Sequence, residues 1–247
     1  MTRVGRVVVL AAGLGSLVGL LAWAVVDLPA FGHVQSAYAV FARHASVADR
    51  HAANTVAAVV FDLRGLDTMA EETILFAAAT ATALLLRSTR DEEAEQADDS
   101  GEGDGLKLFG IALVGAAIVL GLFVVANGYV SPGGGFQGGV VLAAGAGLVF
   151  LAGTYAAFRK VTPQRAVEAA ESLGVLVWPA LGLGVLAGGG GFLANVLPHG
   201  TLGSLASAGT IPILNAATGL AVAAAFTLIA VEFLEELMAE RAREERE

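Results

Sequence analysis

The sequence predicts an all-α integral membrane protein with about six transmembrane helices. Of its 247 residues, 56% are hydrophobic and only 15% are charged, whereas soluble domains carry about 25% charged residues. The charged residues are bunched, so that long segments contain none. Several of these segments reach the roughly 20 residues that a helix needs to cross a hydrocarbon core of about 30 Å. They lack the polar–apolar alternation of a membrane β-strand, which leaves helices as the only structure that satisfies the backbone in lipid.

Six segments are predicted to cross the membrane as helices. They cover residues 5–26, 69–87, 107–126, 138–158, 172–192 and 212–234. Arg3 and Arg6 precede the first segment, as basic residues precede the core of a signal peptide. Its apolar run of about 20 residues exceeds the 7–15 residues of a signal core, so we expect it to be retained as a span.

The basic residues predict that both termini are cytoplasmic and that the protein resides in the cell membrane. With six spans, the two termini share one side with the segments 88–106 and 159–171. That side holds 11 of the 14 Lys and Arg residues, and the other side holds Arg43, Arg50 and Arg64. Lys and Arg accumulate in short cytoplasmic loops, so we expect an N-in, C-in orientation.

An acidic run divides the chain into two modules. Residues 91–104 contain eight acids and no base, a composition that predicts a disordered linker. The linker separates a two-span module, residues 1–90, from a four-span module, residues 105–247. Within the first module, residues 46–63 contain an apolar run that is too short to span. It predicts an amphipathic helix at the outer membrane interface.

A charged cluster stands directly before the second span, where residues 62–73 read DLRGLDTMAEET. On a helix, Arg64, Asp67 and Glu71 share one face. Ionisable groups at the edge of the bilayer are candidates for function, so one hypothesis is an ion or proton path. In it, the adjacent carboxylates of Glu71 and Glu72 hold a proton between them.

Helix capping is a second interpretation of the same residues. Thr68 and Glu71 have the spacing of a capping box, with Thr68 at the N-cap and Glu71 at the third helical position. Acidic residues in a first helical turn are also stabilised by the helix dipole. The two interpretations are compatible, because a capped carboxylate can still titrate.

The uncharged segment SPGGGFQGG, residues 131–139, lies between two predicted spans. Its pattern of glycines resembles a dinucleotide-binding loop, but such a loop follows a β-strand, which is not expected here. Proline fixes a bend, and glycine permits positive φ and close backbone approach. Gly135 and Gly139 also have the spacing at which membrane helices touch, a spacing repeated at Gly15 and Gly19. Packing against other subunits and packing within the chain both remain open. The residues of this predicted packing loop are Pro132, Gly133, Gly134, Gly135, Phe136, Gly138 and Gly139.

The chain has no cysteine and four scattered histidines. This composition excludes disulfides, cysteine-ligated metal sites and thiol nucleophiles. It also offers no ligand set for a haem or an iron–sulfur cluster. We therefore expect no metal, no cofactor, no nucleic-acid partner and no enzymatic activity of the chain itself.

Two segments resemble a known family of membrane complexes. VFDLRGLDTMAEETIL, residues 60–75, resembles the C-terminal module of the large A-type subunit of Mrp-type multisubunit cation/proton antiporters. It is equally similar to the matching small subunits of membrane-bound hydrogenases. NGYVSPGGGFQGGVV, residues 127–141, resembles the signature of the B-type subunit of the same antiporters, and residues 188–215 resemble the final loop of that B-type subunit.

The resemblance implies a non-catalytic membrane subunit of a sodium or other monovalent cation/proton antiporter. It would pack in the bilayer against large A- and D-like subunits and small subunits, and border the cation or proton path. The alternative is the equivalent subunit of a membrane-bound hydrogenase or a related respiratory complex. The Asp, Arg, Asp and Glu of the family motif fall on Asp62, Arg64, Asp67 and Glu71. Glu72 replaces a residue that is usually apolar, and Tyr129 stands where the second motif often carries His.

Overall fold

The computed structural model describes residues 3–26, 36–89, 104–152 and 155–244. Throughout these residues the regular structure is helical and there is no strand, which confirms the predicted fold class. The chain divides into two compact units, residues 1–41 and 42–247. The predicted acidic linker lies outside the described residues, apart from Asp104, where a helix begins.

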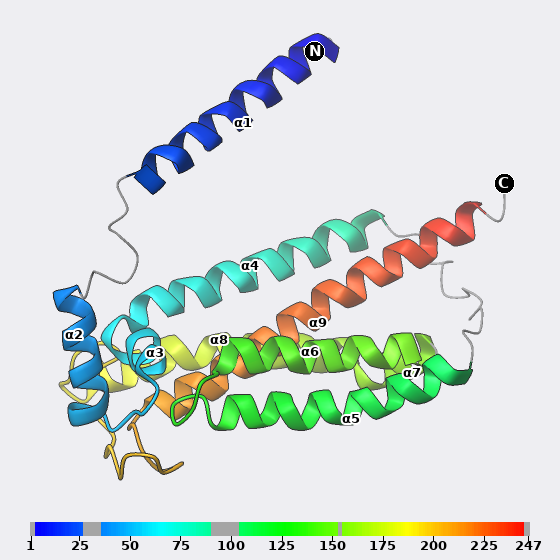
Figure 1. The fold of residues 1–247 in the computed structure, drawn as a ribbon. Helices are drawn as coiled ribbons and strands as arrows, with labels where there is room; N and C mark the ends of the chain where they lie inside the picture. Colours follow the sequence, from blue (N-terminus) through cyan, green and yellow to red (C-terminus); the bar gives the residue numbers. More distant parts are fainter. Residues whose placement is uncertain (1–2, 27–35, 90–103, 153–154, 245–247) are drawn as a thin grey trace. The chain divides into compact units, whose positions relative to one another are not determined.

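The first unit contains helix α1, Arg3–Val26 (Figure 1). Its membrane-length stretch Val7–Val26 is apolar on all sides, and none of it is buried. A helix that is hydrophobic all round is suited to lipid or to a protein partner. A short helix, α2 (Ala37–His44), leads from this unit into the second.

The second unit is built on five long helices that Figure 1 shows lying lengthwise beside one another. They are α4 (Gly65–Thr89), α5 (Asp104–Ala126), α6 (Gly135–Ala152), α8 (Gln164–Ala187) and α9 (Ile211–Glu244). Helix α9 is central, because it contacts α4, α5, α6 and α8. Burial agrees: 61% of the span in α9 is buried, against 17–28% in α4, α6 and α8.

Five described helices are long and apolar enough to cross a membrane: α1, α4, α6, α8 and α9. The remaining predicted span, residues 107–126, corresponds to α5, whose described apolar part, Ala112–Ala126, is shorter. The span predicted at 138–158 is divided into α6 and a short helix, α7 (Tyr155–Val161). The chain is therefore a multi-pass membrane protein.

The span predicted at 172–192 is displaced along the sequence. Helix α8 begins at Gln164, directly after Pro163, and ends at Ala187. Gly189 has a φ of +86°, which glycine adopts readily and which ends a helix. Residues 188–210 consequently form turns, although the prediction placed the glycine-rich start of this segment inside the span.

The interfacial helix predicted near 46–63 consists of three short pieces. Residues Ala45–Asp49 and Val59–Leu63 form single π-turns, and Thr55–Ala58 forms helix α3. The break between them includes His51, whose φ is +50°. Asn54 then caps α3 by accepting hydrogen bonds from two backbone N–H groups, as an N-cap asparagine does.

A hydrophobic core joins these short pieces to the long helices. Phe61 packs against Trp178 of α8, with ring centroids 6.0 Å apart, and both side chains are buried. Ile211 and Leu214 of α9 belong to the same cluster. The segment before α4 is thus fixed against α8 and α9.

Candidate functional site

Three segments meet at one end of the second unit: residues 45–64, 127–135 and 191–215. We call this the loop end. Asn54 joins the first two segments, because its side-chain amide donates to the backbone oxygens of Gly128 and Ser131 at 2.6 and 3.1 Å. Its backbone N–H donates to the Tyr129 oxygen at 3.1 Å. The segment 127–135 is therefore held by Asn54, which lies more than 70 residues earlier in the chain.

Asn215 of α9 also binds backbone groups at the loop end. Its Oδ1 accepts a hydrogen bond from the Gly135 N–H at 2.7 Å, and its Nδ2 donates to the Val125 oxygen at 2.6 Å. Asn215 is 1% exposed. Irregular backbone in a membrane protein must find its hydrogen bonds within the protein, and these two asparagines supply them.

The predicted packing loop contacts this chain's own helices. Gly133 and Gly134 have φ of +140° and +154°, a backbone conformation that glycine adopts without strain. A Cβ on Gly135 would strike Asn215 of α9, and one on Gly139 would lie 2.8 Å from the Cβ of Val222. These glycines therefore pack within their own chain, which is one of the two alternatives that the sequence left open. Their contact with other subunits stays a prediction.

Of the remaining predicted residues of the loop, Gly138 is also enclosed, whereas Pro132 and Phe136 are less so. Gly138 approaches α5, where an added Cβ would lie 2.7 Å from the backbone oxygen of Gly121. Pro132 is exposed and Phe136 is half-buried. These two are the loop positions that a neighbouring subunit could still reach.

Asp62 lies in the loop end, apart from the other predicted acids. Its Oδ2 accepts from the Nε of Arg50 at 2.5 Å and from the side-chain amide of Asn195 at 3.2 Å. The Asn195 Oδ1 in turn accepts from the Thr210 N–H at 2.7 Å. Asp62 thus ties the segment before α4 to the segment before α9.

The capping-box prediction is wrong, because α4 begins at Gly65, three residues before Thr68. The Thr68 hydroxyl instead donates to the Val60 oxygen at 2.6 Å, which ties the first turns of α4 to the preceding π-turn. Arg64 and Asp67 form an ion pair on the surface, with side chains 61% and 53% exposed.

Glu71 and Glu72 lie in different environments. Glu71 is exposed, whereas Glu72 is 1% exposed and faces α9 beside Thr218. Adjacent helical positions point about 100° apart, so only one of the two can face α9. The resemblance favours Glu71, yet Glu72, which departs from the family pattern, is the buried one.

The opposite end of the second unit is held by ion pairs, and we call it the charged end. Arg87 of α4 binds Glu232 of α9 through its Nε at 2.7 Å and Glu168 of α8 at 2.8 Å. Arg159 of α7 binds Glu235 at 2.9 Å. The sequence analysis did not pair these residues, although acids within the apolar sequence of α9 were a signal that such partners exist.

Tyr129 stands where the family motif often carries His, and it has a structural role in this chain. It is 4% exposed, and its hydroxyl donates to the Leu205 oxygen at 2.5 Å. Burial raises the pKa of the Tyr129 phenol above its usual value of 10.0, so this group keeps its proton at neutral pH. Its role here is to hold the loop end together.

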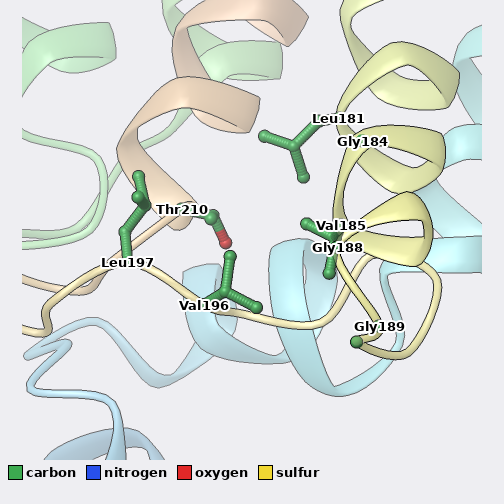
Figure 2. Close-up of a pocket in the computed structure, with 9 residues that line it drawn as sticks. Leu181, Gly184, Val185, Gly188, Gly189, Val196, Leu197 and Thr210 are labelled. Atoms are coloured by element: carbon green, nitrogen blue, oxygen red, sulfur yellow. The ribbon is translucent and has the colours of Figure 1, made fainter.

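An apolar groove of about 620 Å³ lies where α8 meets the segment that leads to α9 (Figure 2). Val185 and Val196 line it, and Thr210 is its polar residue. In the described part of the chain no three His, Asp or Glu side chains are placed to hold a metal ion. None of the residues that line the groove is acidic, so the groove is separate from the predicted acids in and before α4.

Comparisons with known proteins give the following similarities. A family model described as a domain related to the MnhB subunit of Na+/H+ antiporter matches residues 106–228, and the MbhE model, described as the E-type subunit of MBH, matches residues 2–99. An uncharacterized protein of Methanocaldococcus jannaschii is 30% identical over 204 residues, which are 72% of this chain and 75% of the relative.

Two solved structures are also similar. One is a chain of the membrane-bound sulfane sulfur reductase, an archaeal respiratory membrane complex, with a TM-score of 0.73 and 29% identity over 94% of this chain and 99% of that one. The other is a chain of the Mrp complex from Dietzia sp., with a TM-score of 0.70 and 25% identity over 94% of this chain. The match spans only 26% of that second chain.

Proposed function

This chain belongs to the family of membrane subunits related to MnhB of Na+/H+ antiporters, joined to a module of the MbhE family, and we propose that it acts as a non-catalytic subunit of a monovalent cation/proton antiporter. The observation that carries this proposal is the match of one continuous chain to both modules. In the proposal, residues 1–90 and 105–247 are two modules joined by the acidic linker 91–104. Sodium is the cation we favour.

The proposed orientation places both termini in the cytoplasm of a cell membrane. The ion pairs support it, because Arg87, Arg159, Glu168 and Glu232 meet at one end of the second unit. That end corresponds to the segments that the basic residues assign to the cytoplasm. The loop end then faces outward.

We assign the exposed acids at the head of α4 to the border of the ion path. Asp67 and Glu71 are exposed on the chain itself, although carboxylates at the edge of a bilayer normally face protein or water. A neighbouring subunit that contributes the rest of the path would supply that environment. Glu72 extends the acidic group inward toward α9.

Replacement of Glu71 by Gln tests this assignment. We expect cation-dependent proton flux through the purified whole complex in liposomes to fall at least tenfold, since the amide cannot bind or release a proton. Assembly should be unchanged, because Glu71 makes no hydrogen bond or ion pair to another described residue. Normal flux through an intact complex would remove Glu71 from the path.

A respiratory complex is the second candidate. The reductase chain is matched over nearly its whole length, whereas only about a quarter of the antiporter chain is matched. Affinity capture of the tagged chain from native membranes separates the two candidates. Antiporter subunits alone would support the proposal, and a redox enzyme subunit with metal ligands would support the alternative.

A further inference from the structure

We propose that this chain carries a proton path of its own between α4, α8 and α9, in which Glu72 and Glu171 receive and release the proton. The inference rests on the proposed function, because it presumes a complex that moves protons. It adds a residue, Glu171, that no sequence motif marks. It also places the path inside this chain and not only at its border with a partner.

Glu72 is an enclosed carboxylate without a charged partner. It is 1% exposed, and Thr218 on the facing side of α9 is fully buried. The Thr218 hydroxyl is the neighbour that can donate to the Glu72 carboxylate, but no hydrogen bond of good geometry is formed by either carboxylate oxygen or by that hydroxyl. Leaving such groups unsatisfied is costly, which points to a position that a proton or a water molecule visits.

Glu171 on α8 is enclosed in the same way. It is 2% exposed, and its Oε1 has no hydrogen-bond partner. Gly174, one turn further along α8, packs so closely on α9 that a Cβ there would lie 2.7 Å from the oxygen of Ala217. Residues three apart share a helix face, so Glu171 also faces α9.

The two acids lie at successive depths along α9. Thr218, beside Glu72, and Glu232, in the charged end, are separated by 14 residues, or about 21 Å of helix. Glu171 lies between these depths, because Gly174 is level with Ala217 while Glu168 is in the charged end. Gly174 packs level with Ala217 and Ala221, and Glu171 is three residues nearer the charged end. At the helical rise per residue, the first interval is therefore about 6 Å and the second about 15 Å. Water molecules that enter between the helices would bridge them.

The described charged groups near Glu72 and Glu171 differ along the helices, with a basic residue present only near the charged end. Among the described residues, the charge that acts on Glu72 is the like charge of its neighbour Glu71 on the same helix. Glu171 has Glu168 one turn away, and Glu168 binds Arg87, which also binds Glu232 of α9. A proton that reaches Glu171 is thus one helical turn from a network of ionised groups that opens toward the exposed end of the helices.

The chemistry requires proton exchange alone. At each acid an O–H bond of a hydrated proton breaks as an O–H bond forms on a carboxylate oxygen, and the reverse step passes the proton to the next water. An isolated carboxyl group in an apolar interior is stable when it carries a proton and costly when it is charged. A metal cation would need further ligands around the same point, and no group of three His, Asp or Glu side chains is placed to hold one among the described residues.

Flux through the whole complex in liposomes, reported by a trapped pH-sensitive dye, tests the path. We expect Glu72→Gln and Glu171→Gln each to lower the proton flux at least tenfold, and the double variant to be no slower than the slower single variant, because groups in series share one path. Glu171→Asp should recover part of the flux. The matched control is Glu235→Gln, which removes an acid that pairs with Arg159 outside the path and should stay within twofold of the unaltered complex. Flux within twofold for Glu171→Gln in an intact complex overturns the proposal.

Infrared spectroscopy of the purified complex tests the same proposal without transport. The unaltered protein should show the band of a protonated carboxyl group that Glu171→Gln removes, and that shifts within minutes in D2O. A Glu171 carboxyl that stays ionised at all accessible pH values, or one that never exchanges with D2O, contradicts the proposal. An exchanging carboxyl in a complex that shows no cation-dependent flux would instead overturn the proposed antiporter function.

Discussion

The loop end and the charged end of the second unit are held together by different forces. At the loop end, Asn54 and Asn215 satisfy backbone groups of neighbouring segments, and glycines bring backbone against backbone. At the charged end, long side chains of Arg87 and Arg159 reach carboxylates on α8 and α9. Two paired side chains can be replaced together by another compatible pair, whereas a backbone group cannot be replaced by a mutation. We therefore expect the charged end to tolerate paired changes that the loop end does not.

Replacement of Gly135 by Ala should have the largest effect on stability. The added Cβ would lie 2.8 Å from the Gly219 nitrogen and 2.9 Å from the Thr218 Cβ, so α6 and α9 must move apart. Overpacking of this kind costs about 3 kcal/mol. Thermal unfolding of the purified chain in detergent measures the loss. Gly147→Ala on the same helix is the control, because nothing lies within 4 Å of its Cβ, and an equal loss there would contradict the contact argument.

Replacement of Asn215 by Ala should be the next most harmful change. It removes the partner of the buried Gly135 N–H and one of two hydrogen bonds to the Val125 oxygen, a combined loss of about 2–3 kcal/mol. Asn127→Ala provides the comparison, since that side chain bonds only to the oxygen of Phe123 in its own turn. If both variants unfold at the same temperature, the hydrogen bonds of Asn215 do not hold the loop end.

Replacement of Arg87 by Gln should destabilise the chain by about 2 kcal/mol. It breaks the ion pair that Arg87 makes with Glu232, whose side chain is 1% exposed, and breaking a buried ion pair costs several kcal/mol. The Arg87 side chain is 33% exposed, so water offsets part of the loss. The double variant Arg87→Gln, Glu232→Gln should recover most of the stability. If the double variant is as unstable as Arg87→Gln alone, packing of the Arg87 side chain, and not its charge, stabilises the charged end.

Replacement of Asp67 by Asn should have the smallest effect, about 0.5 kcal/mol or less. Its ion pair with Arg64 is on the surface, where such pairs contribute little and are screened by salt. The difference in unfolding temperature between the Asp67→Asn variant and the unaltered protein should therefore be small at low salt and vanish at high salt. A large difference that persists in high salt would show that the pair is enclosed.

The sequence predicted the membrane class and most helices, because long uncharged segments have few alternative structures. It could not predict which neighbours the glycines meet. Gly15 and Gly19 have the same spacing as Gly135 and Gly139, yet added Cβ atoms on the first pair would meet nothing within 4 Å in their own unit. The spacing permits close contact, and the position of another helix decides whether contact occurs.

The candidate site was predicted in its location but not in its arrangement. The motif before α4 contained the acids, and helical spacing placed Arg64 near Asp67. Which of Glu71 and Glu72 is buried depends on where α9 lies, and that helix is more than 130 residues away in the chain. Glu171 had no local signal, since two acids three residues apart, Glu168 and Glu171, are also typical of the solvent-exposed face of a helix.

Transport by the purified chain alone is the most direct test of the account that this protein is one component of a larger complex and not a complete antiporter. The chain would be inserted into liposomes, and proton movement in response to a sodium or potassium gradient compared with that of the whole complex. We expect exchange by the complex and no exchange above protein-free liposomes by the chain alone. Rapid cation-dependent proton exchange by the isolated chain would contradict the account.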